Sequence, residues 1–135
     1  MITRLNPDTL HKNPVYAQVA VVNSGATLVF VGGQNGVDAD GRLAAKDIAG
    51  QTVQTMKNVV AALNAAGASM RDVFKMTIYL VQGQPLQEAF AAAQPFLETG
   101  AQASTVSGLM VAGLANPDYL IEVEAVAAIA PVGQS

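Results

Sequence analysis

The sequence predicts an α+β domain in which a mixed six-stranded sheet is covered on one face by two helices. Two stretches with helical spacing, residues 48–66 and 85–100, each lie between stretches of strand-like sequence. A helix between two strands favours parallel pairing, whereas strands that follow each other directly favour hairpins, so the sheet should be mixed. The length of 135 residues corresponds to one domain, and we expect a single domain over residues 1–135.

The first half of the chain is expected to supply three strands and the first helix. The strands are predicted at residues 2–6, 16–22 and 27–32. The turn residues 23–25 favour a hairpin between the second and third strands, and the unbroken apolar run of the third indicates a central strand that is buried on both faces. Asp47 is placed to cap the helix that follows, and Gly67 is placed to end it.

The second half is expected to supply a strand, the second helix and two further strands. They are predicted at residues 73–80, 85–100, 104–110 and 120–127. Pro85 suits the first turn of the helix, whereas Pro95 should kink the helix or end it early, and Gly100 should close it. The buried stripe of this helix should consist of Leu86, Phe90, Ala93 and Leu97.

The last predicted strand carries two carboxylates in apolar surroundings. Its core-facing side should consist of Ile121, Val123, Ala125 and Ala127. Glu122 and Glu124 share the opposite side of the strand. Either both belong to a solvated outer face, or one of them lines a pocket and handles a proton or a water molecule.

The composition indicates an association of subunits. Hydrophobic residues make up 51% of the chain and charged residues 13%, which is below the usual share of about a quarter. Because so few charges cannot cover the surface well, we expect an oligomer that buries apolar area between subunits. Exposed alanines are the alternative explanation for the apolar excess.

Charge and residue content exclude several classes of function. The net charge is −3 and no run of Lys or Arg occurs, which argues against a nucleic-acid partner and against a ribonuclease. The absence of cysteine and the single histidine, His11, argue against disulfides, thiolate catalysis and a metal site. No apolar run is long enough to span a membrane and the start lacks the pattern of a signal peptide, so we expect a cytoplasmic protein without a membrane partner.

Several motifs along the chain resemble those of the RidA/YjgF (Rid) family. They are found at residues 16–18, 30–34, 47–52, 65–69, 72–79 and 121–125. The resemblance implies a chorismate-mutase-like fold, a homotrimer whose sheets form a central barrel, and small-molecule clefts at the subunit interfaces. It also implies the hydrolysis of enamines and imines, such as 2-aminoacrylate, to a 2-keto acid and ammonia without a cofactor.

The resemblance assigns roles to individual residues. Glu122 matches the family's water-positioning glutamate, Tyr16 matches a pocket tyrosine, and Gly33 and Gln34 match the family's Gly-Gln at a strand end. The two adjacent glycines, Gly32 and Gly33, also predict a bulge or the close approach of a ligand or another backbone segment.

Three positions depart from the family pattern. Gly32 stands where the family usually has serine, Phe90 where it has asparagine, and Ala103 where an arginine grips the substrate carboxylate. Ser104 and Thr105 are possible donors beside the missing arginine, and Arg42 or Arg71 of a neighbouring subunit is a possible substitute for it. The departures leave two hypotheses open, which are an atypical cofactor-free deaminase and a non-catalytic trimer that binds or senses a small molecule.

Overall fold

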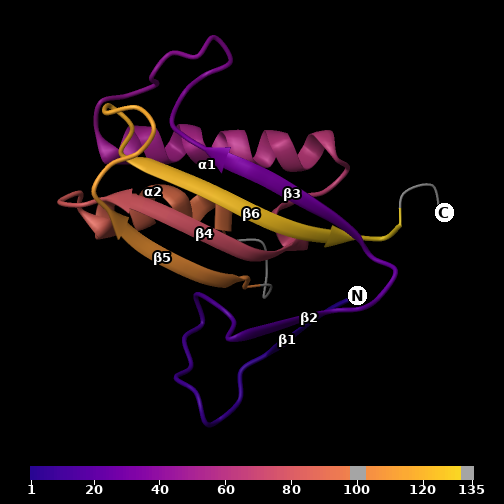
Figure 1. Cartoon of the computed structure of the whole chain (residues 1–135). Coiled ribbons are helices and arrows are strands. Elements are labelled where there is room, and N and C mark those ends of the chain that lie inside the picture. Colours follow the sequence, from indigo (N-terminus) through magenta and orange to yellow (C-terminus); the bar gives the residue numbers. More distant parts are fainter. Residues whose placement is uncertain (98–102, 132–135) are drawn as a thin grey trace.

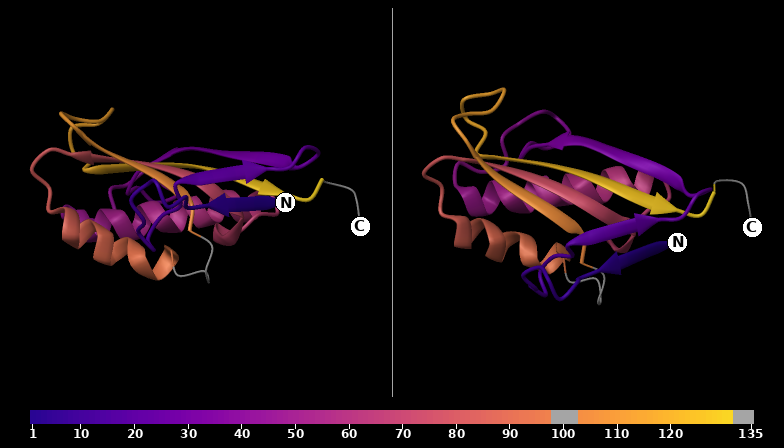
Figure 2. Two further views of the ribbon diagram at one scale, coloured as in Figure 1. Left: turned by 90° about the horizontal axis from the view of Figure 1, so that it is seen from below. Right: turned by 60° about the horizontal axis from the view of Figure 1, so that its bottom comes forward.

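The computed structural model describes residues 1–97 and 103–131, which form one layer of sheet and one layer of helices (Figure 1). The strands are β1 (Ile2–Leu5), β2 (Val19–Val22), β3 (Thr27–Gln34), β4 (Val73–Val81), β5 (Thr105–Val111) and β6 (Ile121–Ile129). The helices are α1 (Ile48–Ala65), the short 3-10 helix η1 (Met70–Asp72) and α2 (Leu86–Leu97). Figure 2 shows α1 and α2 on the same face of the main sheet. The predicted α+β class, with two helices on one face of a mixed sheet, is confirmed.

The six strands form two sheets rather than the single sheet that the sequence predicts. β3, β6, β4 and β5 form a four-stranded sheet in that order, and β1 pairs only with β2. β3 runs antiparallel to β6, β6 antiparallel to β4, and β4 parallel to β5. The predicted hairpin between β2 and β3 is wrong, because the ladder of β2 is taken by β1 and that of β3 by β6.

β3 lies at the edge of the main sheet, which contradicts the prediction of a central strand buried on both faces. Phe30 is 73% exposed, and Leu28 beside it on the same face is also exposed. Both side chains lie on the face opposite the helices, which no element of the described chain covers. The apolar run of this strand therefore reflects an uncovered sheet face, not a buried strand.

The core lies between α1 and the main sheet. The alternate residues Ile121, Val123, Ala125 and Ala127 of β6 are buried there, as the sequence predicts. Asp47 caps α1 through a hydrogen bond from the Gly50 N–H, and Gly67 follows the helix with a φ of +78°. Both end signals are thus confirmed.

α2 packs against α1 and leaves a hollow between itself and the sheet. The carbonyl oxygen of Pro85 accepts the N–H of Ala89, and the helix continues through Pro95 to Leu97. The predicted end at Gly100 lies outside the described residues. The predicted buried stripe is wrong in part, because Ala89 is buried but Leu86 and Phe90 are exposed at the hollow. None of the helices in the described ranges is long and apolar enough to cross a membrane.

Candidate functional site

Glu122 lies across Gly33, where β3 leaves its regular register with β6. The pairing of β3 with β6 shifts between Val31 and Gln34, which confirms the bulge that the two glycines predict. A Cβ atom at Gly33 would lie 2.7 Å from Cδ of Glu122 and closer still to Oε2. The strand can therefore carry only glycine at this position while the carboxylate keeps its place.

Asn35 holds the carboxylate of Glu122 from the other side. Its Nδ2 donates a hydrogen bond of 2.9 Å to the carbonyl oxygen of Ile121 and one of 3.3 Å to Oε1 of Glu122. Of the residues that the structure describes, none donates a hydrogen bond to the second carboxylate oxygen, Oε2. Because a carboxylate oxygen accepts hydrogen bonds readily, Oε2 is placed to bind a water molecule. Asn35 was not among the residues that the sequence singled out.

Glu124 has a different environment although it shares a face with Glu122. The hydroxyl of Tyr79 donates a hydrogen bond of 2.7 Å to Oε1 of Glu124. This bond raises the pKa of Tyr79 above its ordinary value of 10.0, helped by partial burial and by the negative charges of Glu124 and Glu122. The two carboxylates therefore differ in their donors, since Glu122 accepts from the amide of Asn35 and Glu124 accepts from the hydroxyl of Tyr79.

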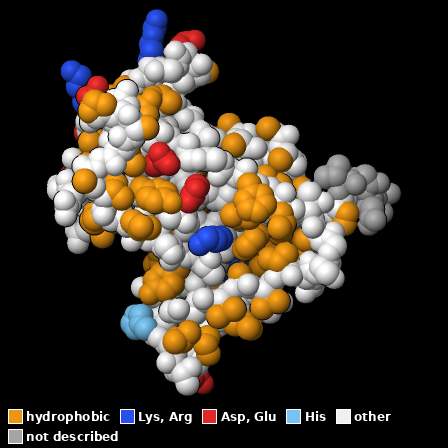
Figure 3. Space-filling view, viewed as in Figure 1, with side chains coloured by type: hydrophobic (Ala, Val, Ile, Leu, Met, Phe, Trp, Pro, Cys, Tyr) orange, Lys and Arg blue, Asp and Glu red, His pale blue; other side chains and the backbone are white. Residues whose placement is uncertain are grey.

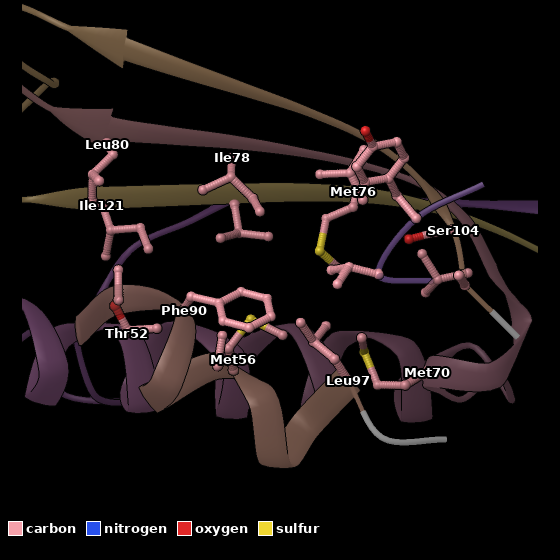
Figure 4. Close-up of a pocket in the computed structure, with 18 of the residues that line it drawn as sticks. Thr52, Met56, Met70, Met76, Ile78, Leu80, Phe90, Leu97, Ser104 and Ile121 are labelled. Carbon is pink, nitrogen blue, oxygen red and sulfur yellow. The ribbon is translucent and has the colours of Figure 1, made fainter. Parts of the chain in front are cut away.

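A second group of candidate residues lines the hollow between the helices and the sheet (Figure 4). It consists of Tyr16, Phe90, Ala103 and Ser104. The N–H of Ala17 donates to the carbonyl oxygen of Ser104 at 2.9 Å, which ties the loop before β2 to the start of β5. Loop and strand thereby bring Tyr16 and Ser104 to one end of the hollow.

Three other predicted site residues join neither group through a contact of their side chains. The hydroxyl of Thr105 donates to the carbonyl oxygen of Phe74 at 3.0 Å. The amide of Gln34 donates to the carbonyl oxygen of Gly32 at 3.2 Å, and a Cβ atom at Gly32 would meet no atom within 4 Å. The hydrogen bond of Gln34 stays within β3, whereas that of Thr105 joins the start of β5 to β4.

Within one chain, the pair formed by Glu122 and Asn35 lies apart from the second group, which lines the hollow. Glu122 is paired with Tyr79 near the end of β4, whereas the start of β5, next to Ser104, is paired with Lys75 near the start of β4. Lys75 and Tyr79 are four residues apart along β4, which corresponds to about 13 Å. Glu122 also lies on the open face of the sheet, whereas the hollow lies on the helix face. One chain alone therefore does not bring the water-binding carboxylate to the second group.

An arginine does lie beside Ala103, but it comes from β1. Arg4 donates from Nε to the carbonyl oxygen of Ala103 at 2.7 Å and from Nη2 to that of Val73 at 3.0 Å. The guanidinium thus fastens the β1–β2 sheet to the starts of β4 and β5. Arg42 and Arg71 are both exposed. The sequence did not single out Arg4, because nothing in it indicates where the separate β1–β2 sheet docks.

The open face of the main sheet carries an apolar patch beside polar and charged side chains such as Lys75, Thr77 and Glu124. Figure 3 shows hydrophobic side chains gathered over the middle of β3 and β6, with acidic side chains beside them. Leu28, Phe30 and Leu109 are exposed on this face. Such a surface is typical of a subunit interface.

Comparisons with known proteins agree with the fold and the motifs. The sequence model of the family described as endoribonuclease L-PSP matches residues 8–129. A RutC family protein of Pyrococcus abyssi is 31% identical over 113 residues, which cover 83% of this chain and 84% of that protein.

Solved structures are similar over nearly the same length. A protein of the conserved Rid family from Yersinia pestis, of unknown function, is 29% identical, with a TM-score of 0.78 over 95% of this chain and 98% of that one. The YjgF gene product of E. coli is 30% identical, with a TM-score of 0.69 over 79% of this chain and 84% of its own. The chain belongs to the Rid (RidA/YjgF) family.

Proposed function

We propose that the protein hydrolyses the C=N bond of small enamines and imines, without a cofactor, in sites formed between the subunits of a homotrimer. The observation that carries the proposal is the carboxylate of Glu122, which is held by Asn35 across Gly33 with Oε2 available to a water molecule. The substrate would be of the 2-aminoacrylate type, and the products would be a keto compound and ammonia.

The chemistry requires one water molecule and one proton shuttle. An enamine first takes a proton on carbon and loses one from nitrogen, which gives the imine. The water oxygen then attacks the imine carbon, while Glu122 accepts a proton from the water and passes it to the nitrogen, which gives the carbinolamine. The hydroxyl proton of the carbinolamine moves to the nitrogen as the C–N bond breaks, so that the carbonyl forms and ammonia leaves. No oxidant, reductant or metal takes part in this sequence.

The separation of the two groups supports a site between subunits. Glu122 faces the open side of the sheet, where the apolar side chains of Leu28 and Phe30 are exposed in one chain. Tyr16 and Ser104 instead lie at the far end of β4 on the helix side. A second copy seated on the open face would cover Phe30 and would bring its own Tyr16 and Ser104 towards the first copy's Glu122. Closed cyclic symmetry would repeat this contact three times.

Ala103 shapes the expected substrate preference. A substrate carboxylate buried without a cationic partner costs several kcal/mol. The hydroxyls of Tyr16 and Ser104 are suited to an uncharged polar group, such as an amide or ester in place of the carboxylate. We therefore expect the amide of 2-aminoacrylate to be hydrolysed faster than 2-aminoacrylate itself.

The test is the release of ammonia from enamine generated in the assay by a pyridoxal-dependent lyase. Glu122→Gln keeps an oxygen that can accept the hydrogen bond from Asn35 but cannot take a proton from water, so the rate should fall to the uncatalysed level. Glu124→Gln is the matched control, since its amide oxygen still accepts from Tyr79, and it should keep the rate of the unmodified protein. Equal rates for the protein, Glu122→Gln and the solution without protein would exclude the hydrolase.

A non-catalytic, small-molecule-binding trimer is the second candidate, and Ala103 is the observation that favours it. Together with Gly32 and Phe90, it makes the expected cleft less polar than the family pattern. In this case neutral metabolites would raise the melting temperature, because a ligand that binds only the folded state stabilises it. Ammonia release would be absent, and Glu122→Gln would change the affinity for the ligand only slightly.

A further inference from the structure

We propose that the hollow between α1, α2 and the main sheet is a binding site for a small, uncharged molecule of about the size of one aromatic ring, with one hydrogen-bonding group. The site is built within one chain and excludes Glu122 and Gly33, although Tyr16 and Ser104, which belong to the proposed hydrolytic site, also line it. The inference rests on the lining of the cavity and does not require that the protein hydrolyses C=N bonds.

The size of the cavity sets the size of the ligand. Its volume is about 170 Å³. An apolar cavity of about 150 Å³ in another protein stays dry and binds benzene, so this one has room for a single ring with a short substituent. The main sheet forms one wall through residues such as Met76, Ile78 and Ile121, and the helices form the other (Figure 4).

The small side chains of α2 explain why the space is empty. Ala89 and Ala93 are one turn apart, and both face the cavity where larger residues would meet the sheet. Leu86 and Phe90 lie on the same side of α2, and both line the cavity without being buried by neighbouring residues. Three methionines, Met56, Met70 and Met76, also line it. Because methionine is flexible and polarisable, this wall can adapt to the shape of a ligand.

The lining sets the chemistry of the ligand. No described residue that lines the cavity carries a charge, so an ion would be desolvated there without a partner. Thr52 lines the cavity from α1, and its Oγ1 is the buried side-chain oxygen for which the described structure offers no hydrogen-bond partner. A buried hydroxyl without a partner is unfavourable, and a ligand with one donor or acceptor relieves that cost.

Three probes of one size test the proposal on the full chain by thermal shift and titration calorimetry. Benzyl alcohol and toluene should each give a saturable rise in melting temperature, with benzyl alcohol binding more tightly, whereas benzoate should give none. Thr52→Val should weaken the binding of benzyl alcohol about tenfold and leave that of toluene unchanged. Binding of benzoate in preference to the neutral probes would overturn the inference, as would the absence of binding by both neutral probes.

A filled cavity provides the second test. Ala93→Leu places a larger side chain in the cavity and should abolish the binding of both neutral probes while keeping the protein folded. Ala91→Leu is the matched control, since Ala91 is an exposed residue of the same helix, and it should leave binding unchanged. Glu122→Gln should also bind both neutral probes as the unmodified protein does, which separates this site from the proposed hydrolysis. Equal binding by Ala93→Leu and Ala91→Leu would show that the probes bind elsewhere.

Discussion

Replacing Gly33 by alanine tests whether Glu122 lies across the bulge of β3. The added Cβ atom would lie 2.7 Å from Cδ of Glu122, which is closer than two carbon atoms can approach. The main chain of the bulge is held by β6, whereas the glutamate side chain can rotate away. We therefore expect the carboxylate to leave its position and to lose its 3.3 Å hydrogen bond from Asn35.

The change in stability should be small, because two effects oppose each other. Alanine in place of glycine within a strand stabilises the folded protein by about 0.5–1 kcal/mol. The lost hydrogen bond costs about 0.5–1.5 kcal/mol. The free energy of unfolding of Gly33→Ala should thus lie within about 1 kcal/mol of that of the unmodified protein. The proposed hydrolysis should nevertheless fall about 100-fold, since a displacement of about 1 Å in a reacting group has that effect.

Urea unfolding at one fixed protein concentration and ammonia release together measure both effects. Gly108→Ala is the control, because Gly108 lies within β5 and a Cβ atom there meets no atom within 4 Å. It should gain the full stabilisation of about 0.5–1 kcal/mol and keep its rate. The reasoning is refuted if Gly33→Ala gains as much stability as Gly108→Ala and releases ammonia at the unmodified rate.

Three further predictions concern interactions that stabilise the fold around the candidate site. Gln51→Leu leaves one main-chain N–H and two carbonyl groups without the partners that the buried amide now provides, and urea unfolding should show a loss of about 2–4 kcal/mol. Arg4→Lys loses the fork that holds two carbonyl oxygens, so hydrogen exchange of the β1 and β2 amides should become faster, whereas the exposed Arg42→Lys should leave it unchanged. The raised pKa of Tyr79 contributes stability that is fully present below pH 10 and is lost as the pH rises through the folded-state pKa. Alkaline unfolding of Tyr79→Phe should therefore lack this part of the pH dependence.

Local signals in the sequence were sufficient to predict most elements and the buried face of the last strand. Asp47 and Gly67 mark the ends of α1 through chemistry that depends only on neighbouring residues. The alternation from Ile121 to Ala127 fixes which side of β6 is buried, and hence which side carries Glu122. The adjacent glycines before Gln34 predict the bulge for the same local reason.

Features that depend on distant contacts could not be predicted in this way. An unbroken apolar strand such as β3 looks the same whether neighbouring strands or another surface covers it, so its edge position and the exposure of Phe30 were missed. The contact of Arg4 with Ala103 joins residues that are 99 positions apart. The cavity beside Ala93 depends on how far α2 lies from the sheet, which periodicity does not determine.

The most direct test of the central claim is the mixing of two inactive variants. In the proposed trimer, Glu122 of one copy and Tyr16 of another form one site, so Glu122→Gln and Tyr16→Ala should each be inactive alone. When the two chains are refolded together in equal amounts, random assembly gives intact sites at about one quarter of the interfaces, so about a quarter of the unmodified rate of ammonia release should return. If the mixture is no more active than the two variants alone, the claim that the site is formed between subunits is contradicted.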